Sequence, residues 1–208
     1  MRDEQGKTRD PERSREAILD AAEHLFAEKG YEGTSLQEIG QHANVSRGTP
    51  NYFFGSKERL YGNVLDRVFE AEQASLMQSL GEQGDSGTQD ILALAVSSFV
   101  DFLRARPTFP RLIEREALQN ARFLKTRSAY LKVFKAGLAL IEGEVTRPNR
   151  RPIDPAHLLV SIIALCWFPL VHTETFLHPL GMDTTAPHFW EDRKRHILDL
   201  VLYGLLKR

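Results

Sequence analysis

The sequence has 208 residues, enough for one domain or two small ones, and its 42% hydrophobic and 26% charged residues are typical of an ordinary soluble globular protein. The net charge of −1 excludes a strongly basic chain, so overall charge gives no support to nucleic-acid binding. The single cysteine, Cys166, excludes a disulfide framework and a CxxC metal site, which favours a reducing, cytoplasmic compartment.

The N-terminal stretch is charged and lacks the apolar segment of a signal peptide. Residues 1–9 are expected to form a flexible arm whose cations can touch phosphates, with a plain disordered tail as an equal alternative. Asp10 and Pro11 then form a good helix start, an N-cap followed by proline in the first helical position. This helix carries an apolar stripe for the core and is expected to end at Gly30.

Residues 34–61 contain the most informative pattern, two short helices joined by a tight turn and followed at once by a third helix. Apolar residues recur at i, i+3 and i+7 from Leu36 onward, which indicates one buried face of the first short helix. Thr34 or Ser35 is available as its N-cap. Asn44 is expected to end it, because asparagine tolerates the left-handed conformation common after a helix. The pattern predicts a helix-turn-helix.

Ser46 is the expected N-cap of the second short helix, whose first turn then carries Arg47, Gly48 and Thr49. Two polar side chains flank a residue without a side chain, where a backbone can approach another surface closely. This arrangement suits a recognition helix that enters the DNA major groove by its N-terminal end.

Charge is distributed unevenly over this part of the chain. Residues 39–57 contain Arg47 and Lys57 and no acid, whereas acids concentrate on the first helix. Lys57 opens the third helix of the pattern, a position that favours phosphate binding. We interpret the segment as a locally basic face on an acidic domain.

A long and specific motif runs through residues 13–61. Its members are Gly30-Tyr31, Thr34-Ser35, Ile39, Ala43, Val45-Ser46-Arg47-Gly48-Thr49, Phe54 and Ser56-Lys57-Glu58-Arg59-Leu60. The motif resembles the TetR family of bacterial transcriptional regulators. Four positions depart from the family pattern: Pro50 replaces the usual aliphatic residue, Asn51 the usual tyrosine, Gly40 an alanine and Asn44 a glycine. Pro50 removes only the first intrahelical hydrogen bond, but it is expected to distort the helix start.

The resemblance implies a helix-turn-helix DNA-binding domain, residues 10–57, and a helical ligand-binding and dimerisation domain, residues 58–208. Carried over at matching positions, with Asn51 as the one that differs, the residues expected to contact DNA are Thr34, Ser35, Arg47, Gly48, Thr49, Asn51, Tyr52 and Lys57.

The remainder of the chain is predicted to be helical, which makes the fold class all-α with about nine helices. A helix starts at Ser56 and runs to about Leu80, and residues 81–88 form the clearest loop. Five further helices are predicted over about residues 89–105, 110–119, 123–147, 155–177 and 188–207.

Residues 155–173 carry no formal charge and were therefore compared with a membrane span. Only Leu158 to Val171 is continuously apolar apart from Ser161, which is too short to cross a bilayer. We predict a buried helix and no membrane partner. In the resembled family the last two long helices of each protomer pair into a four-helix dimer interface, which implies a homodimer; an internal core helix is the alternative.

Aromatic side chains are frequent in the middle helices. In the resembled family the corresponding helices enclose a pocket for a small, usually apolar molecule. Aromatic residues at helical spacing are more often plain core, and that alternative stays open for each of them. The candidate ligand contacts are Phe99, Phe102, Tyr130, Phe134, Leu138, Trp167 and His172.

No catalytic or cofactor motif occurs: GxSxG, GxGxxG, a Walker A loop and HExxH are all missing. His188, Asp192 and His196 share a helix face, but the outer two lie two turns apart, ~12 Å, too far for one ion. We therefore predict no enzyme, no cofactor and no metal site. Cys166, in apolar surroundings, is expected to be an inert small hydrophobe, with an oxidation sensor as the alternative.

The predicted function is a ligand-responsive transcriptional repressor. It would bind a palindromic operator in double-stranded DNA as a homodimer and leave it when a small, mostly apolar effector binds the C-terminal domain. It is expected in the bacterial cytoplasm, associated with the nucleoid when bound to DNA. Two alternatives remain: a constitutive DNA-binding regulator without a ligand, and an all-α enzyme or carrier in which the helix-turn-helix is a coincidence.

Overall fold

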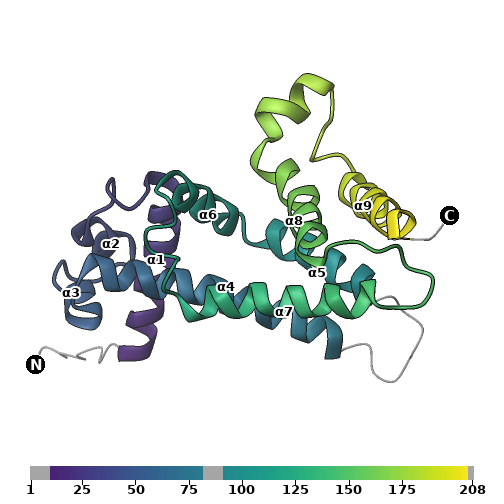
Figure 1. Cartoon of the computed structure of the whole chain (residues 1–208). Helices are drawn as coiled ribbons and strands as arrows, with labels where there is room; N and C mark the ends of the chain where they lie inside the picture. The colour runs from purple at the N-terminus through teal and green to yellow at the C-terminus, as the bar shows by residue number, and fades with distance from the viewer. Residues whose placement is uncertain (1–9, 82–90, 206–208) are drawn as a thin grey trace, which may run out of the picture. The chain divides into compact units, whose positions relative to one another are not determined.

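The computed structural model describes residues 10–81 and 91–205, and every long element within them is an α-helix (Figure 1). The fold is therefore all-α, as predicted. The predicted arm of residues 1–9 and the predicted loop beyond Gly81 lie outside the described residues. The helices form two compact units: unit 1 comprises Met1–Arg67 and Arg111–Lys125, and unit 2 comprises Val68–Pro110 and Thr126–Arg208.

Unit 1 begins with α1 (Pro11–Lys29), whose ends follow from its capping residues. The Asp10 carboxylate accepts a hydrogen bond from the Glu12 N–H at 3.0 Å, and Pro11 occupies the first helical turn, where no N–H is needed. Gly30 ends the helix at φ 78°, a backbone angle that glycine adopts without strain. Both ends of the helix confirm the prediction.

The next two helices, α2 (Leu36–His42) and α3 (Thr49–Phe54), form the helix-turn-helix and pack against α1 (Figure 1). The Ser35 hydroxyl caps α2 by accepting a hydrogen bond from the Glu38 N–H at 3.2 Å. Asn44 follows α2 in the left-handed conformation, at φ 56°, as predicted. The capping residue of α2 and the left-handed residue that follows the helix are therefore among those that the sequence predicted.

The start of α3 differs from the prediction, and Pro50 explains the difference. The expected helix began at Arg47 with Ser46 as its cap, but the helix begins at Thr49, and Gly48 stands at the cap position without a side-chain hydrogen bond. Proline has no N–H and cannot donate to the carbonyl four residues earlier. Starting the helix at Thr49 places Pro50 in the first turn, where that donor has no intrahelical partner.

The long helix α4 (Lys57–Gly81) contributes residues up to Arg67 to unit 1 and the rest to unit 2. Its predicted start is confirmed, because the Ser56 hydroxyl accepts a hydrogen bond from the Arg59 N–H at 3.1 Å. Three aliphatic residues of its first turns are fully buried in unit 1: Leu60, Val64 and Leu65.

A buried carboxylate from α6 (Thr108–Leu118) organises the centre of unit 1. The Tyr61 hydroxyl donates to one oxygen of Glu116 at 3.0 Å, and the Phe123 N–H donates to the other at 2.9 Å. Burial, reinforced by the Glu116 carboxylate, raises the pKa of Tyr61, so the phenol keeps its proton and its hydrogen bond. The rings that contact one another around this bond are Phe26, Tyr31, Tyr61 and Phe123.

Unit 2 is built around α5 (Ile91–Ala105), which packs against α7 (Ser128–Val145), α8 (Pro155–Val171) and α9 (Phe189–Leu205). Apolar residues from three of these helices form the buried core, which lowers the free energy of the folded state by removing apolar surface from water. The core includes Val96, Val100, Leu103, Ile162 and Ile197.

The start of α7 at Ser128 lies beyond residue 123, where the sequence pattern had placed it. Asn120 and Ala121 both adopt positive φ, 55° and 54°, and turn the chain after α6. The Phe123 N–H donates to Glu116, and residues 119–126 form turns and no helix. The predicted start at residue 123 is therefore wrong by five residues.

The end of α8 at Val171 is also earlier than predicted, and a proline inside the helix explains it. Pro169 lacks the N–H that would bond to the Leu165 carbonyl. The Arg193 guanidinium of α9 donates to that carbonyl instead, at 2.8 Å. The chain continues as a π-helical turn, Thr173–Leu177, which the sequence pattern had joined to α8.

Among the described residues, no single helix has both the length and the apolarity of a membrane span. Only α8 combined with the turns that follow it, Thr173–Leu177 and His178–Leu180, passes on length and composition, as a pair bent by 81°.

Candidate functional site

The outer face of the helix-turn-helix consists of side chains from α3 and the turn before it. Arg47, Asn51 and Tyr52 are exposed, and Tyr52 has 83% of its surface open to solvent. On the opposite side of α3, Pro50 and Phe54 are buried. Packing therefore holds the helix while its polar face remains open to a macromolecule. Three of the predicted DNA contacts share this surface.

The glycines of this region have different roles. A Cβ atom placed on Gly48 would meet nothing within 4 Å, so packing inside the protein does not require a glycine there. At Gly40, a Cβ would lie 3.2 Å from the Ser46 carbonyl oxygen and 3.4 Å from a ring carbon of Pro50. Two departures from the family motif, Gly40 and Pro50, are thus neighbours, and the missing side chain of one makes room for the ring of the other.

Polar residues that flank α3 are already engaged within unit 1. The Thr34 hydroxyl is buried and donates to the Gly30 carbonyl at 2.8 Å. The Lys57 ammonium donates to the carbonyls of Tyr31 and Thr34, at 2.9 and 3.1 Å, and lies 4.3 Å from the centre of the Tyr31 ring. The hydroxyl of Thr49 lies 2.6 Å from that of Ser46. Contacts of Thr34, Ser35, Thr49 and Lys57 with DNA stay predictions.

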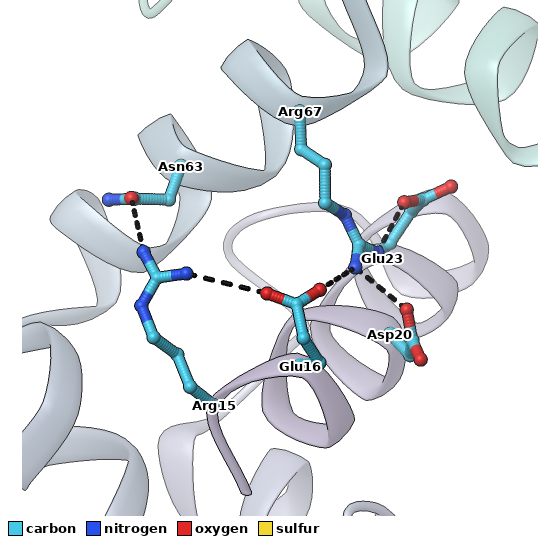
Figure 2. A network of polar contacts seen from close by, with 6 residues as sticks. All are labelled: Arg15, Glu16, Asp20, Glu23, Asn63 and Arg67. Carbon is cyan, nitrogen blue, oxygen red and sulfur yellow. Dashed lines mark hydrogen bonds and ion pairs between the residues drawn. The ribbon is translucent and has the colours of Figure 1, made fainter. Parts of the chain in front are cut away.

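Arg67 connects α4 to the acidic face of α1 within unit 1 (Figure 2). Its guanidinium donates to Asp20 and to Glu23, each at 2.7 Å, and lies 3.4 Å from Glu16. Burial alone would lower the pKa of Arg67, but the hydrogen bonds to Glu23 and Asp20 outweigh burial and raise it. The three carboxylates therefore hold a charged arginine at the joint between the two helices.

Arg15 extends the same network toward the start of α4 (Figure 2). Its guanidinium lies 3.4 Å from Glu16 and 3.5 Å from the side-chain oxygen of Asn63. It also lies 5.2 Å from the centre of the Phe54 ring, the last residue of α3. Contacts of α1 thus reach both α4 and the end of the helix that carries the exposed polar face.

The second candidate site is a chain of aromatic contacts in unit 2. The Phe69 ring lies 5.2 Å from Phe109 and 5.3 Å from Tyr130, measured between ring centres. Phe109 in turn contacts Phe102 at 5.2 Å and Trp167 at 5.7 Å. We call these five residues the aromatic cluster. Three of them were predicted ligand contacts, and Phe69 and Phe109 were not in that set.

The other predicted ligand contacts lie around or outside this cluster. Phe134, which is exposed, reaches it through Tyr130 at 4.9 Å. His172 belongs to a different group, in which its ring is tilted against Phe168 with the ring centres 4.4 Å apart and lies edge-on to Phe176 at 5.4 Å. Phe99 and Leu138 are half-buried. Contact of any of these residues with a ligand stays a prediction.

One acidic residue next to the aromatic cluster was missed by the sequence analysis. Glu72 follows Phe69 by three residues on α4 and is only 9% exposed. Burial raises its pKa to about 7, and no neighbouring charge contributes to that change. A single acid in the apolar stripe of a helix was the signal that could have identified it.

Cys166 and the metal-ligating residue types offer no reactive centre in the described part of the chain. Burial raises the pKa of the Cys166 thiol to about 12, although the nearby Arg193 acts in the opposite direction. At neutral pH the thiol is therefore protonated and weakly nucleophilic. Within the described ranges, no group of three or more His, Cys, Asp or Glu side chains is placed to hold a metal ion.

Comparison with known proteins gives two family matches. The family described as bacterial regulatory proteins, tetR family, matches residues 18–64, and the one described as tetracyclin repressor-like, C-terminal domain, matches residues 89–201. The HTH-type transcriptional regulator RutR of Escherichia coli is 32% identical over 157 residues, which cover 72% of this chain and 70% of RutR.

Two further relatives match over nearly the whole chain. The HTH-type transcriptional repressor NicS of Pseudomonas putida is 26% identical over 203 residues, 93% of each sequence. The crystal structure of SCO4942 from Streptomyces coelicolor superposes with a TM-score of 0.70 at 22% identity, covering 92% of this chain and 98% of that one. At this identity the structural match establishes the fold alone.

Proposed function

The chain belongs to the TetR family of transcriptional regulators, and from this membership we propose that it is a dimeric repressor, released from an inverted-repeat operator by a small, mostly apolar effector. As a member of this family it is a helix-turn-helix regulator and not an enzyme. The relative NicS is named a transcriptional repressor, which supports the proposal that this chain represses transcription.

The observation that carries the proposal is the exposed face formed by α3 and the turn before it. Arg47 and Asn51 have the side chains that read guanine and adenine edges in the major groove. Tyr52 and Thr49 flank them, and the open space around Gly48 permits close approach of its backbone to DNA. In the same proposal Thr34, Ser35 and Lys57 contact phosphates beside the reading helix.

A second copy of the chain is the proposed partner of α8 and α9. Both helices expose large apolar side chains, a feature that marks interaction surfaces in proteins. On α9, Leu200 is 51% exposed and Tyr203 is 72% exposed, and on α8 both Val160 and Phe168 are exposed. A two-fold dimer would present two copies of α3 to half-sites about 34 Å apart along the duplex.

The aromatic cluster of unit 2 is the proposed effector site. The effector would bind more tightly to a conformation that cannot engage both half-sites. Its binding would then reduce the population of the DNA-competent conformation, and the size of this effect is set by the difference in affinity for the two conformations. The regulator would act in the cytoplasm, and on the nucleoid while it is bound to DNA.

A gel-shift assay with the DNA that flanks the protein's own gene tests this function. We expect a specific complex that a member of a panel of apolar and aromatic metabolites dissociates. A specific complex that no member of the panel changes, together with an unchanged melting temperature, would favour a constitutive regulator. Absence of any specific complex with operator-sized DNA would contradict DNA reading by α3.

Single substitutions should distinguish residues that contact bases from residues that contact phosphates. Arg47→Ala or Asn51→Ala is expected to cost about 1 to 3 kcal/mol of operator binding and to relax preference at particular base pairs. Lys57→Ala should weaken all sequences alike and lower the salt-dependence slope by about one. Fluorescence anisotropy with operator variants at several salt concentrations measures both effects.

The control for these measurements is Arg104→Ala, an exposed arginine of α5 that pairs with Asp101 and lies outside α8 and α9. It should leave operator affinity unchanged. Because Lys57 also holds the carbonyls of Tyr31 and Thr34, its variant is compared at a temperature well below its own melting point. A changed base preference with an unchanged salt slope in Lys57→Ala would show that its assignment is wrong.

A further inference from the structure

The buried glutamates of the described residues differ in how their charge is compensated. Glu23 accepts from Arg67, Glu116 accepts from Tyr61 and the Phe123 N–H, and the carboxylate of Glu144 pairs with Arg147 and Arg150. Glu72 is buried to a similar degree, yet within the described ranges no hydrogen bond or ion pair meets it. Three of the four follow the general rule that buried acids are partnered, and Glu72 does not.

Two serine hydroxyls in this part of unit 2 are engaged with other groups. On α4 and α5, the Ser79 and Ser98 hydroxyls bond to each other at 3.0 Å, and both also donate to the Ser75 carbonyl. Apolar and aromatic groups occupy the preceding turn, where Val68 and Phe69 are buried. The second half of α4 runs beside α7 here, through the contact of Phe69 with Tyr130 (Figure 1).

The groups around Glu72 favour the binding of a positively charged group. An ionised carboxylate away from water is costly unless a cation or a strong donor reaches it. Aromatic rings carry negative charge on their faces and attract cations. Phe69, the member of the aromatic cluster on α4, precedes Glu72 by three residues. Residues at this spacing are neighbours on a helix surface, so one molecule can contact both.

We propose that Glu72 is the polar anchor of the effector site and that the effector joins a cationic nitrogen to a hydrophobic, ring-bearing body. The inference rests on the proposed function, because it assumes that the aromatic cluster is the effector site. The nitrogen donates to the Glu72 carboxylate, and the body packs on the rings of Phe69, Phe109 and Trp167. A neutral residue would fit the interior better, and a buried charge kept at a cost in stability is typical of a binding site.

Three probes that share one body test the charge preference: 4-phenylbutylamine, 4-phenylbutan-1-ol and 4-phenylbutyrate. Isothermal titration of the full-length protein at pH 8 is expected to show the amine binding roughly tenfold or more tighter than the alcohol, and the carboxylate weakest. In Glu72→Gln the preference for the amine should fall to within about twofold. The matched control is Glu70→Gln, an exposed acid on the same helix, which should keep the full preference.

The pH dependence of the melting temperature provides a second test. A Glu72 side chain that only filled space in the core would not produce it. The pKa of Glu72 is raised from the 4.5 of an ordinary glutamate to about 7 by burial, so above pH 4.5 ionisation favours the unfolded chain. Glu72→Gln should therefore melt above wild type, with a difference that is absent below pH 4.5, grows between pH 4.5 and 7 and is constant at higher pH. Glu72→Asp, which keeps the charge, should keep part of the amine preference.

The inference is overturned if the alcohol or the carboxylate binds wild type as tightly as the amine, if no amine binding occurs at millimolar concentration, or if Glu70→Gln loses the preference equally. A Glu72→Gln variant that melts below wild type at pH 8 would also overturn it. Release of operator DNA by the alcohol without an amine preference would leave the proposed function intact while refuting this inference. Amine selectivity without any operator complex would refute the proposed function alone.

Discussion

Replacing Arg67 with methionine is expected to lower the free energy of unfolding by about 3 to 5 kcal/mol. Methionine keeps an unbranched stem but removes the guanidinium that donates to Asp20 and Glu23 at 2.7 Å. The Glu23 side chain, 7% exposed, stays buried after it loses this cation. Thermal melting of the full-length protein, followed by circular dichroism, should shift downward by on the order of 10 °C.

Arg59→Met is the matched control, because Arg59 is an exposed arginine of the same helix. Its effect on the free energy of unfolding should stay within about 0.5 kcal/mol. The double variant Arg67→Met with Glu23→Gln should recover part of the loss, since the amide leaves no buried charge. Equal stability of Arg67→Met and wild type would show that the network in Figure 2 is a solvent-screened surface feature.

The paired substitution Leu200→Glu with Tyr203→Glu is expected to produce a monomer whose operator affinity falls by about a hundredfold or more, or about 2.7 kcal/mol. Both residues lie exposed on α9, and burying two carboxylates of each protomer without partners at the proposed interface is prohibitive. A monomer engages one half-site and loses the gain from simultaneous binding. Sedimentation velocity and gel shift on one preparation measure the two effects together.

Leu118→Glu serves as the control for this pair, because Leu118 of α6 is 86% exposed and lies outside both helices. It should remain dimeric and bind the operator normally. A doubly substituted α9 that still sediments as a dimer with full operator affinity would place the interface elsewhere.

The helix ends of unit 1 were predictable because a cap acts within one turn of chain. Asp10 accepts from an N–H two residues on, and Gly30 and Asn44 need only their own backbone angles. Pro50 shifted the start of α3 for an equally local reason, but the sequence does not show that Gly40 leaves space for its ring. That contact joins two helices across the turn.

The helix ends of unit 2 were less predictable because distant residues decide them. Pro169 leaves the Leu165 carbonyl without its helical donor, and the donor that replaces it, Arg193, comes from another helix. After Val171 the sequence has four polar residues before Phe176, and this pattern does not distinguish the π-helical turn from a continued α-helix.

The candidate sites show the same division between local and distant causes. Exposure of Arg47, Asn51 and Tyr52 follows from the motif, since the opposite face of α3 has to pack. The bonds of Lys57 to two carbonyls of the turn before α2 do not follow from it, because folding brings those carbonyls near. The position of Glu72 in the apolar stripe of α4 was visible in the sequence, but its burial depends on the other helices that pack there.

The placement of Trp167 in the aromatic cluster provides an intrinsic fluorescent probe. The chain contains two tryptophans, and the other, Trp190, lies on α9, where its indole N–H donates to the Thr184 carbonyl at 3.1 Å. A Trp190→Phe variant would leave Trp167 as the one source of tryptophan emission in the 208-residue sequence. Because DNA bases emit almost no light, changes in that emission would report occupancy of the cluster while the protein is still on its operator, without any attached dye.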